Sequence, residues 1–344
     1  MAERSAALRL TARDFKSDQD VRWCPGCGDY AILAAMQGFL PELGIPRERI
    51  VFISGIGCSS RFPYYLDTYG IHSIHGRAPA IATGLSGSRP DLSVWVVTGD
   101  GDALSIGGNH LIHALRRNVN IKILLFNNRI YGLTKGQYSP TSELGKITKS
   151  TPAGSVDHPF NPISLALGAE ASFVARTVDA DRKHLQSVLR AAAAHQGSAF
   201  IEIYQNCNIF NDGAFDLIKE PDTREDALIR LEHGQPVTSG DGQRVVVHPQ
   251  GSFGLQVVPA GEVRPEEVVV HDATAEDPAY AFALSRLPGD GLRNTPIGVF
   301  RSVSRPVYDE LLRDQVTAAT AAVTGSREDE LAAILNAGDT WTIN

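Results

Sequence analysis

Cysteine is scarce in this chain, whose 344 residues include only four. Four thiols are too few for a disulfide scaffold, and in a reducing compartment thiols favour metal ligation or catalysis. The sequence also lacks any apolar run close to the about 18 residues that a membrane-spanning helix needs. Residues 1–20 form a leader that mixes charges of both signs around no apolar core. We therefore expect a cytoplasmic protein without a membrane segment, in which the cysteines are ligands.

Positive charge is also in deficit. The chain has 32 Lys and Arg against 39 Asp and Glu, a net charge of −7, and a sequence pI near 5.8. This balance argues against nucleic acid or an anionic membrane as the main partner, and small molecules or proteins fit better. A hydrophobic fraction of 43% is enough to fill a core. The length allows one large α/β domain with an appendage, or two domains.

The first regular elements are readily identified. Apolar residues at helical spacing predict a helix over Asp29–Leu43, which ends before Gly44 and Pro46. The run "IVFIS" predicts a buried strand over Ile50–Ser54, followed by a Gly-rich loop that carries Cys58. Cys58 is therefore expected just beyond the end of a parallel strand.

A strand–helix–strand unit is the most informative part of the sequence. β-branched and apolar residues predict strands over Leu92–Thr98 and Ile121–Phe126, and the segment between them predicts a helix over Ala103–Arg117. Such crossovers join parallel strands and are almost always right-handed, so both strands end at the same edge of the sheet. Asp100 and Asn128, which follow the two strands, are therefore expected to be neighbours.

The second half contains further elements and a shift of composition. Between Asn161 and Phe200 the pattern predicts a helix, a short strand and an Ala-rich helix, and "AFIEIY" is a buried strand that leads to Cys207. Near residue 210 the chain becomes polar and turn-rich, with the strand-like "RVVVH" and the helix-like "AYAFALSRL" beyond. We therefore expect a leader (1–20), a main domain (21–210) and a small C-terminal extension (211–344). The predicted fold class is α/β, with a mainly parallel sheet flanked by helices.

The turn "GDGD", Gly99 to Asp102, is a candidate cation and diphosphate site. Backbone amides at a helix N-terminus favour an anion, but two carboxylates would repel a bare phosphate unless a divalent cation lay between them. Magnesium prefers oxygen ligands and commonly bridges a protein to a diphosphate. Asp100, the Asn128 amide oxygen and the Ile130 carbonyl are the candidate ligands. The plain alternative is that GDG is only a turn and the asparagines only a loop.

The pair Cys24 and Cys27 in "WCPGCGDY" leaves several chemistries open. A two-residue gap suits structural zinc, an iron–sulfur cluster or a redox disulfide. A disulfide between these two would leave Cys58 and Cys207 unexplained. On spacing alone, zinc and a cluster remain equally compatible with the four cysteines.

Five ordered motifs together carry a resemblance. "GDGDALSIGG" followed by "LLFNN" resembles the thiamine-diphosphate motif. More narrowly, "WCPGCGDY", "GIGCSSR", "HGRAPAIATG", "TGDGDALSIGGNH" and "NNRIYGLTKGQYSPTS" resemble the β subunit of 2-oxoacid:ferredoxin oxidoreductases, nearest the 2-oxoglutarate branch. The likeness covers roughly residues 20 to 215, and no motif is assigned after it.

The resemblance implies a set of cofactors and their residues. It implies thiamine diphosphate with Mg²⁺ and a [4Fe–4S] cluster held by Cys24, Cys27, Cys58 and Cys207, with coenzyme A as co-substrate. Zinc cannot change its oxidation state, whereas a cluster can take electrons singly from the decarboxylated substrate. The implied cofactor-binding residues are Gly57, Ser59, Ser60, His75, Gly99, Asp100, Gly101, Asp102, Asn128, Ile130, Gly132 and Leu133.

Three residues have an implied catalytic role. His75 is placed to face the diphosphate, while a structural histidine satisfied by backbone is the alternative. Leu133 and Lys135 follow the magnesium loop, where the resembled family recognises the 2-oxoacid. Lys135 would pair with a substrate carboxylate, and the alternative is a solvated lysine.

The implied activity is oxidative decarboxylation of 2-oxoglutarate with coenzyme A to succinyl-CoA and CO₂, with ferredoxin as electron acceptor. Nothing in the chain resembles the domain that supplies the glutamate for the aminopyrimidine ring, so we expect an α subunit in an αβ or (αβ)₂ assembly. Alternatives are the same chemistry on pyruvate or branched-chain 2-oxoacids, a non-redox thiamine decarboxylase with structural zinc, and a thiamine-fold scaffold without turnover.

Overall fold

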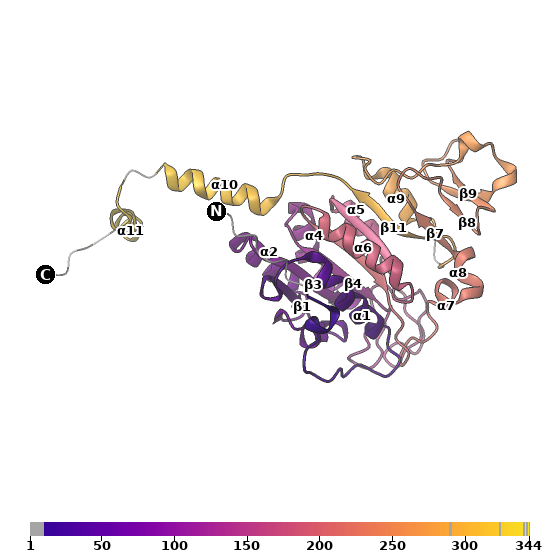
Figure 1. Cartoon of the computed structure of the whole chain (residues 1–344), viewed down its shortest axis with the longest axis horizontal. Coiled ribbons are helices and arrows are strands. Elements are labelled where there is room, and N and C mark those ends of the chain that lie inside the picture. The colour runs from indigo at the N-terminus through magenta and orange to yellow at the C-terminus, as the bar shows by residue number, and fades with distance from the viewer. Residues whose placement is uncertain (1–9, 289–290, 323–324, 340, 342, 344) are drawn as a thin grey trace.

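A central sheet of eight strands organises the chain (Figure 1). The computed structural model describes residues 10–288, 291–322 and 325–339, together with Trp341 and Ile343. The strand order is β2-β1-β3-β4-β6-β5-β11-β7. These strands are β1 (Ile50–Ser54), β2 (Tyr69–His72), β3 (Ser93–Gly99), β4 (Lys122–Asn127), β5 (Phe173–Val178), β6 (Ala199–Tyr204), β7 (Leu228–Leu231) and β11 (Thr295–Ser302).

The sheet is mainly parallel, as predicted. All pairings from β2 to β5 are parallel, whereas β11 runs antiparallel to β5, and β7 lies parallel to β11. In the register of β3 with β4, Gly99 stands opposite Phe126. Asp100 and Asn127 therefore leave adjacent strands at one sheet edge, which is the edge predicted from the strand–helix–strand unit.

Helices cover both faces of the sheet, because its central strands are buried on both sides. α1 and α6 pack on one face around an aromatic-rich core, and α2, α4, α5 and α9 pack on the other. The bounds are α1 (Asp29–Phe39), α2 (Ala78–Ser88), α4 (Gly108–Arg117), α5 (Pro162–Gly168), α6 (Arg182–Ala194) and α9 (Ala279–Ser285). Short 3-10 turns lie at Ala12–Phe15, Leu40–Leu43, Arg47–Arg49, Ser59–Tyr65, Ala260–Glu262 and Pro265–Glu267.

One predicted element is wrong in detail. The helix expected over Ala103–Arg117 is two helices, α3 (Asp100–Leu104) and α4, separated at Ser105–Gly107. The break lets Gly76 approach: a Cβ on Gly76 would lie 2.5 Å from the Gly107 backbone nitrogen. The interruption therefore brings the loop that carries His75 against the GDGD turn.

The chain on both sides of residue 210 shares one sheet. Beyond that point come α7 (Asp216–Lys219), α8 (Pro221–Ala227) and a small antiparallel sheet of β8 (Thr238–Ser239), β9 (Arg244–Val247) and β10 (Gln256–Pro259). β7 and β11 return to the main sheet, and Ile297 and Phe300 of β11 are fully buried. The boundary near residue 210 stays a prediction.

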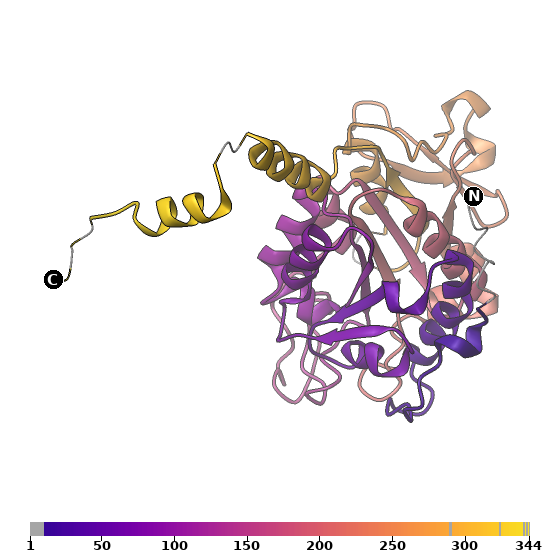
Figure 2. The same ribbon diagram turned by 60° about the vertical axis from the view of Figure 1, so that its left-hand side comes forward.

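Two helices end the described chain. α10 (Tyr308–Ala321) packs against α2, and α11 (Arg327–Leu335) lies beyond it, away from the sheet in both views (Figures 1 and 2). Asp309 anchors α10, since its carboxylate accepts hydrogen bonds from the Ser86 hydroxyl and the Asn120 backbone N–H, each at 3.0 Å. Among the described helices, none has the length and apolar character needed to cross a membrane.

Candidate functional site

Asp100 is a buried carboxylate at the end of β3. Its side chain is 2% exposed, and its Oδ2 accepts hydrogen bonds from the hydroxyls of Ser139 and Thr141, each at 2.5 Å. Burial raises the pKa of Asp100 to about 6, and the two hydroxyls only partly offset that effect. Asp100 forms no ion pair with any described residue. A desolvated carboxylate without a counter-charge is suited to receive a cation.

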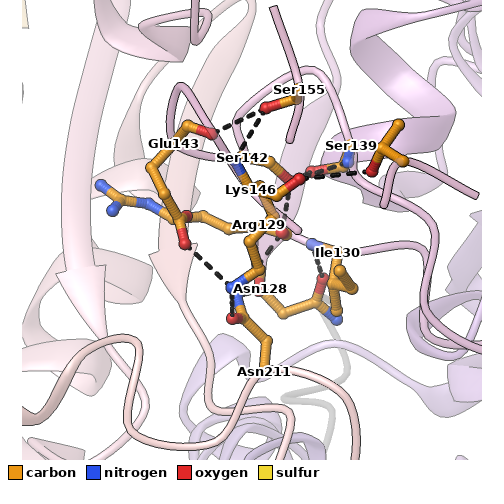
Figure 3. A network of polar contacts seen from close by, with 10 residues as sticks. Asn128, Arg129, Ile130, Ser139, Ser142, Glu143, Lys146, Ser155 and Asn211 are labelled. Carbon is orange, nitrogen blue, oxygen red and sulfur yellow. Dashed lines mark hydrogen bonds and ion pairs between the residues drawn. The ribbon is translucent and has the colours of Figure 1, made fainter. Parts of the chain in front are cut away.

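The loop of residues 127–132, here the asparagine loop, follows β4 beside Asp100. Asn128 accepts a hydrogen bond at its Oδ1 from the Ile130 backbone N–H at 3.1 Å. Arg129 has φ +56°, a left-handed conformation that is uncommon for such a residue. Ser142 donates to the Arg129 carbonyl at 2.6 Å, and Asn211 donates to the Asn128 carbonyl at 2.9 Å (Figure 3). These contacts fix the backbone that presents Asn128 and Ile130.

Glycines allow the asparagine loop to approach the GDGD turn closely. A Cβ on Gly101 would lie 2.2 Å from the ring of Tyr131, and the Tyr131 hydroxyl donates to the Gly101 carbonyl at 2.9 Å. Gly99 faces Ser59, whose Oγ would lie 3.5 Å from a Cβ at that position. Gly101 therefore must be glycine in this arrangement, because the tyrosine ring occupies the space of any side chain.

Asp102 faces different loops from Asp100. Its Oδ1 accepts from the backbone N–H groups of Ile56 at 3.1 Å and Gly76 at 2.8 Å, and also contacts His75 Nδ1. Its Oδ2 accepts from the Thr98 hydroxyl at 2.7 Å. Of the two carboxylates of the turn, only Asp100 lies beside the asparagine loop. Contact of Asp102 with a cofactor stays a prediction.

Two of the four cysteines, Cys58 and Cys207, lie at the end of the asparagine loop. A Cβ on Gly132 would lie 3.4 Å from the Sγ of Cys58 and 3.6 Å from the Sγ of Cys207, so these two sulfurs converge there. Cys24 is exposed, and Cys27 is partly buried, with its Sγ accepting from Gln205 Nε2 at 3.2 Å. In the part of the chain that the structure describes, no group of three His, Cys, Asp or Glu side chains is arranged to hold a single metal ion.

Burial and negative charge favour the protonated form of two thiols, those of Cys27 and Cys58, by raising their pKa. Burial raises the pKa of Cys58 to about 12, and the neighbouring Asp29 adds to the increase. The same two causes raise the pKa of Cys27. Burial in turn raises the pKa of Asp29 to about 7, which the Cys27 thiol opposes by hydrogen bonding. Thiolate ligands form here only when a positively charged group replaces the thiol protons.

The other predicted site residues divide into two groups. Gly57 (φ +142°) lies in the loop between β1 and Cys58. Ser59 and Ser60 are buried at the start of the 3-10 turn that follows Cys58, and the hydroxyl of Ser60 has no partner among the described residues. Leu133 and Lys135 lie instead on an exposed turn that closes between Tyr131 and Gln137. Among the residues that the structure describes, no contact brings them against Asp100.

Sequence reasoning missed the residues that support the site. Ser139 and Thr141 of "YSPTS" hold Asp100, Asn211 holds the asparagine loop, and Gln205 contacts Cys27. The motif containing the two hydroxyl residues was recognised without a role for either. Hydroxyl and amide residues are common in loops, and only the fold shows which of them face a buried carboxylate or thiol.

Comparisons with known proteins give the family. Residues 55–203 match the family model described as "Thiamine pyrophosphate enzyme, C-terminal TPP binding domain". The chain is 64% identical over 334 residues to 2-oxoglutarate oxidoreductase subunit KorB of Mycobacterium tuberculosis, covering 96% of this chain and 88% of the relative. The chain belongs to the 2-oxoglutarate oxidoreductase β-subunit (KorB) family. The resemblance stated from the motifs is thereby confirmed.

More distant KorB relatives match a shorter part of the chain. The 2-oxoglutarate synthase subunit KorB of Methanocaldococcus jannaschii is 40% identical over 58% of this chain and 73% of its own length. Among solved structures, a 2-oxoglutarate:ferredoxin oxidoreductase from Magnetococcus marinus, with 2-oxoglutarate, coenzyme A and succinyl-CoA bound, matches with a TM-score of 0.75. That match has 33% identity and covers 96% of this chain and 97% of the other. The predicted fold class is confirmed by this likeness and by the sheet itself.

Proposed function

We propose that this KorB-family chain is the β subunit of an enzyme that converts 2-oxoglutarate and coenzyme A to succinyl-CoA and CO₂ and transfers the electrons to ferredoxin. One observation carries the proposal: the candidate cation site lies beside two of the four cysteines, Cys58 and Cys207, at one edge of the sheet. Gly132 of the asparagine loop lies against Cys58 and Cys207, and Ser59, next to Cys58, lies against Gly99. A redox centre and a decarboxylation centre must be neighbours if electrons are to pass between them.

The buried carboxylate supports a magnesium–diphosphate site. Mg²⁺ would be held by Asp100, the amide oxygen of Asn128 and the carbonyl of Ile130. Its positive charge would offset the cost of burying the Asp100 carboxylate. Thiamine diphosphate, when bound, supplies the nucleophile that adds to the 2-oxo group and stabilises the charge left by departing CO₂. The contact of His75 Nδ1 with Asp102 would leave its Nε2 to face the diphosphate.

The cysteine site supports a [4Fe–4S] cluster held by Cys24, Cys27, Cys58 and Cys207. These are all the cysteines of the chain. A cluster accepts one electron at a time, and hydrogen bonds to its sulfur ligands tune its potential. Gln205 would supply such a bond to Cys27. The chain has no cysteine left for a second cluster, so the electrons would leave to an external ferredoxin.

The substrate assignment depends on Lys135 and on an α subunit. Lys135, exposed on its turn with φ +76°, would offer an ammonium charge to the distal carboxylate of 2-oxoglutarate. The α subunit would supply the pyrimidine-binding half of the site in an αβ or (αβ)₂ assembly. Pyruvate and branched-chain 2-oxoacids have no second carboxylate to meet this charge.

Metal and sulfide analysis tests the redox chemistry. We expect about four irons with equal acid-labile sulfide per chain in protein co-expressed with its α partner and purified without oxygen. Cys207→Ser should lower both values, whereas Ser59→Ala, a matched change beside the same site, should leave them intact. Stoichiometric zinc without sulfide would contradict the proposal and favour a non-redox thiamine decarboxylase.

A substrate panel tests the 2-oxoacid. Lys135→Met should raise the KM for 2-oxoglutarate about tenfold, because one charge-assisted contact is lost, and should leave activity with pyruvate unchanged. Lys149→Met, at another exposed lysine, is the matched control. Equal kinetics of the two variants with 2-oxoglutarate would exclude Lys135 as the residue that recognises the substrate.

A further inference from the structure

A cavity of about 220 Å³ lies behind the asparagine loop, on the sheet face covered by α5 and α9. Three of its lining residues carry guanidinium groups: Arg129 of the asparagine loop, Arg176 of β5 and Arg286, which follows α9. Tyr204 at the end of β6 forms part of the wall between them. We call these four residues and the space between them the arginine pocket. No proposed catalytic step uses it.

The carboxylates of the cavity are already paired. Glu202 accepts from Arg176 Nε at 2.6 Å with one oxygen and from Asn127 Nδ2 at 2.7 Å with the other. Glu143 pairs with Lys146 at 2.9 Å. Among the described residues, Arg129 and Arg286 form no ion pair. The cavity therefore has an excess of positive charge that its own side chains do not neutralise.

Aromatic rings lie against two of the guanidinium groups. The Cζ of Arg176 lies 5.2 Å from the centroid of the Tyr204 ring, and that of Arg129 lies 5.8 Å from the same centroid. Arg129 also stacks over Phe215 at 5.2 Å. These are cation–π distances, so the rings help to fix the positions of the two guanidinium groups. The two arginines thus contact the same aromatic ring at the cavity wall.

Arg176 has donor capacity left inside the protein. It is 1% exposed, its Nε binds Glu202, and its Nη1 donates to the Pro296 carbonyl at 3.4 Å. Its Nη2 makes no hydrogen bond to a described residue, and this nitrogen is not one of the fully buried atoms that lack a partner. A guanidinium carries five N–H donors, and a buried one is normally saturated. An oxyanion in the cavity would accept hydrogen bonds from the remaining N–H donors and would also neutralise the excess positive charge.

We propose that the arginine pocket binds a small oxyanion, a carboxylate or phosphate group, and that the bound anion stabilises the asparagine loop in its cation-binding conformation. Arg129 connects anion binding with the conformation of the asparagine loop, because it lies between Asn128 and Ile130 in the sequence and also lines the cavity. Its left-handed backbone, φ +56°, is a conformation that an anion on its side chain would help to retain.

A buried relay strengthens the connection. From Arg176 the contacts run through Glu202 to Asn127, then to the Thr141 hydroxyl, which lies 2.8 Å from Asn127 Oδ1 and 2.5 Å from Asp100 Oδ2. Binding at either end is therefore expected to favour binding at the other, and linkage requires the effect to be reciprocal. This second half of the inference rests on the proposed magnesium–thiamine site, whereas the first half does not.

Anion binding is tested by thermal unfolding of the full chain at constant ionic strength, with inorganic phosphate, succinate or coenzyme A as probe. We expect phosphate or succinate to raise the Tm. The Arg286→Gln substitution should lower the affinity for that anion about tenfold. Arg327→Gln, the same change at an exposed position on α11, is the matched control and should bind as the wild type does. If coenzyme A is the only probe that raises the Tm, and Arg286→Gln removes this increase, the bound anion is one of the phosphate groups of coenzyme A.

Two results would overturn the anion site: no Tm increase with any probe, or identical anion affinities of the Arg286→Gln and Arg327→Gln variants. The coupling is tested by the Kd of thiamine diphosphate with Mg²⁺, which we expect to fall about threefold when the anion is present. An unchanged Kd would overturn the coupling. Complete absence of thiamine binding, with anion binding retained, would overturn the proposed function and leave the anion site standing.

Discussion

At the scale of single residues, burial of the Asp100 carboxylate costs folding stability but makes the side chain suitable for binding a cation. Its folded-state pKa of about 6 lies above its ordinary value of 3.8. Below pH 3.8 the folded and unfolded states are both protonated, and burial costs nothing. As the pH rises to about 6, only the unfolded state ionises, so the cofactor-free fold loses stability, and the loss is complete above that pH. The cation site is thus built at the expense of stability.

We predict that Asp100→Asn stabilises the cofactor-free protein at pH 7.5 and abolishes Mg²⁺-dependent binding of thiamine diphosphate. The stability gain should be about 2 to 3 kcal/mol, because at this pH the neutral asparagine no longer carries the cost of burying the charged carboxylate, whose pKa burial raises to about 6. Urea unfolding at pH 7.5 and pH 4 measures it, and the gain should vanish at the lower pH. A variant less stable than the wild type at pH 7.5 would refute this account of Asp100.

At the scale of elements, Asp102 joins three segments that are distant in the sequence. Its carboxylate connects α3 with the loop after β1, through Ile56, and with the loop after β2, through Gly76. A Cβ on Gly55 would lie only 1.8 Å from Asp102 Oδ2, which shows how closely the loop after β1 packs on this side chain. These loops carry Cys58 and His75, so one carboxylate sets the relative positions of both.

We predict that Asp102→Ala lowers the free energy of unfolding by about 3 kcal/mol or more, because the buried Gly76 N–H and the partly buried Ile56 N–H both lose their acceptor. Asp102→Asn retains one acceptor oxygen and should cost about 1 kcal/mol. Urea unfolding gives both values, and amide hydrogen exchange should show faster exchange at Ile56 and Gly76 in the alanine variant. Equal stability of the two variants would contradict this role of Asp102.

The sequence predicts elements best where the signal is local. Continuous apolar runs predict β1, β3, β4 and β6, and the crossover rule correctly places Asp100 beside the chain that leaves β4. The break between α3 and α4 depends on the approach of Gly76, a residue far away in the sequence. No strand was predicted over Thr295–Ser302, because its pairing with β5 is a long-range contact with no local signature. The roles of Ser139 and Thr141 were missed for the same reason.

At the scale of the whole molecule, the last third of the chain completes the sheet that carries the site. β11 covers the edge of β5, and Arg176 of β5 donates to the Pro296 carbonyl of β11. Arg301, also on β11, donates to the Ala171 carbonyl at 2.8 Å. Without β11, the buried strand β5 would become an unprotected sheet edge. The residues after 210 therefore contribute to the stability of the region that contains the candidate site.

The two terminal helices differ in what they contribute, and deletion separates them. We predict that removal of residues 325–344 leaves the Tm of the isolated chain unchanged, because α11 has no buried residue. Removal of residues 308–344 should lower the free energy of unfolding by about 2 kcal/mol or more, since the Asn120 N–H and the Ser86 hydroxyl lose their acceptor, Asp309.

Asp309→Ala in the full-length chain is the matched control and should reproduce most of the longer deletion's effect. Thermal and urea unfolding of the three variants measure these differences. If the shorter deletion destabilised the isolated chain as much as the longer one, α11 would have to pack on the sheet domain in solution. If it instead weakened assembly with the α subunit alone, the exposed Leu331, Ile334 and Leu335 would be assigned to the interface between subunits.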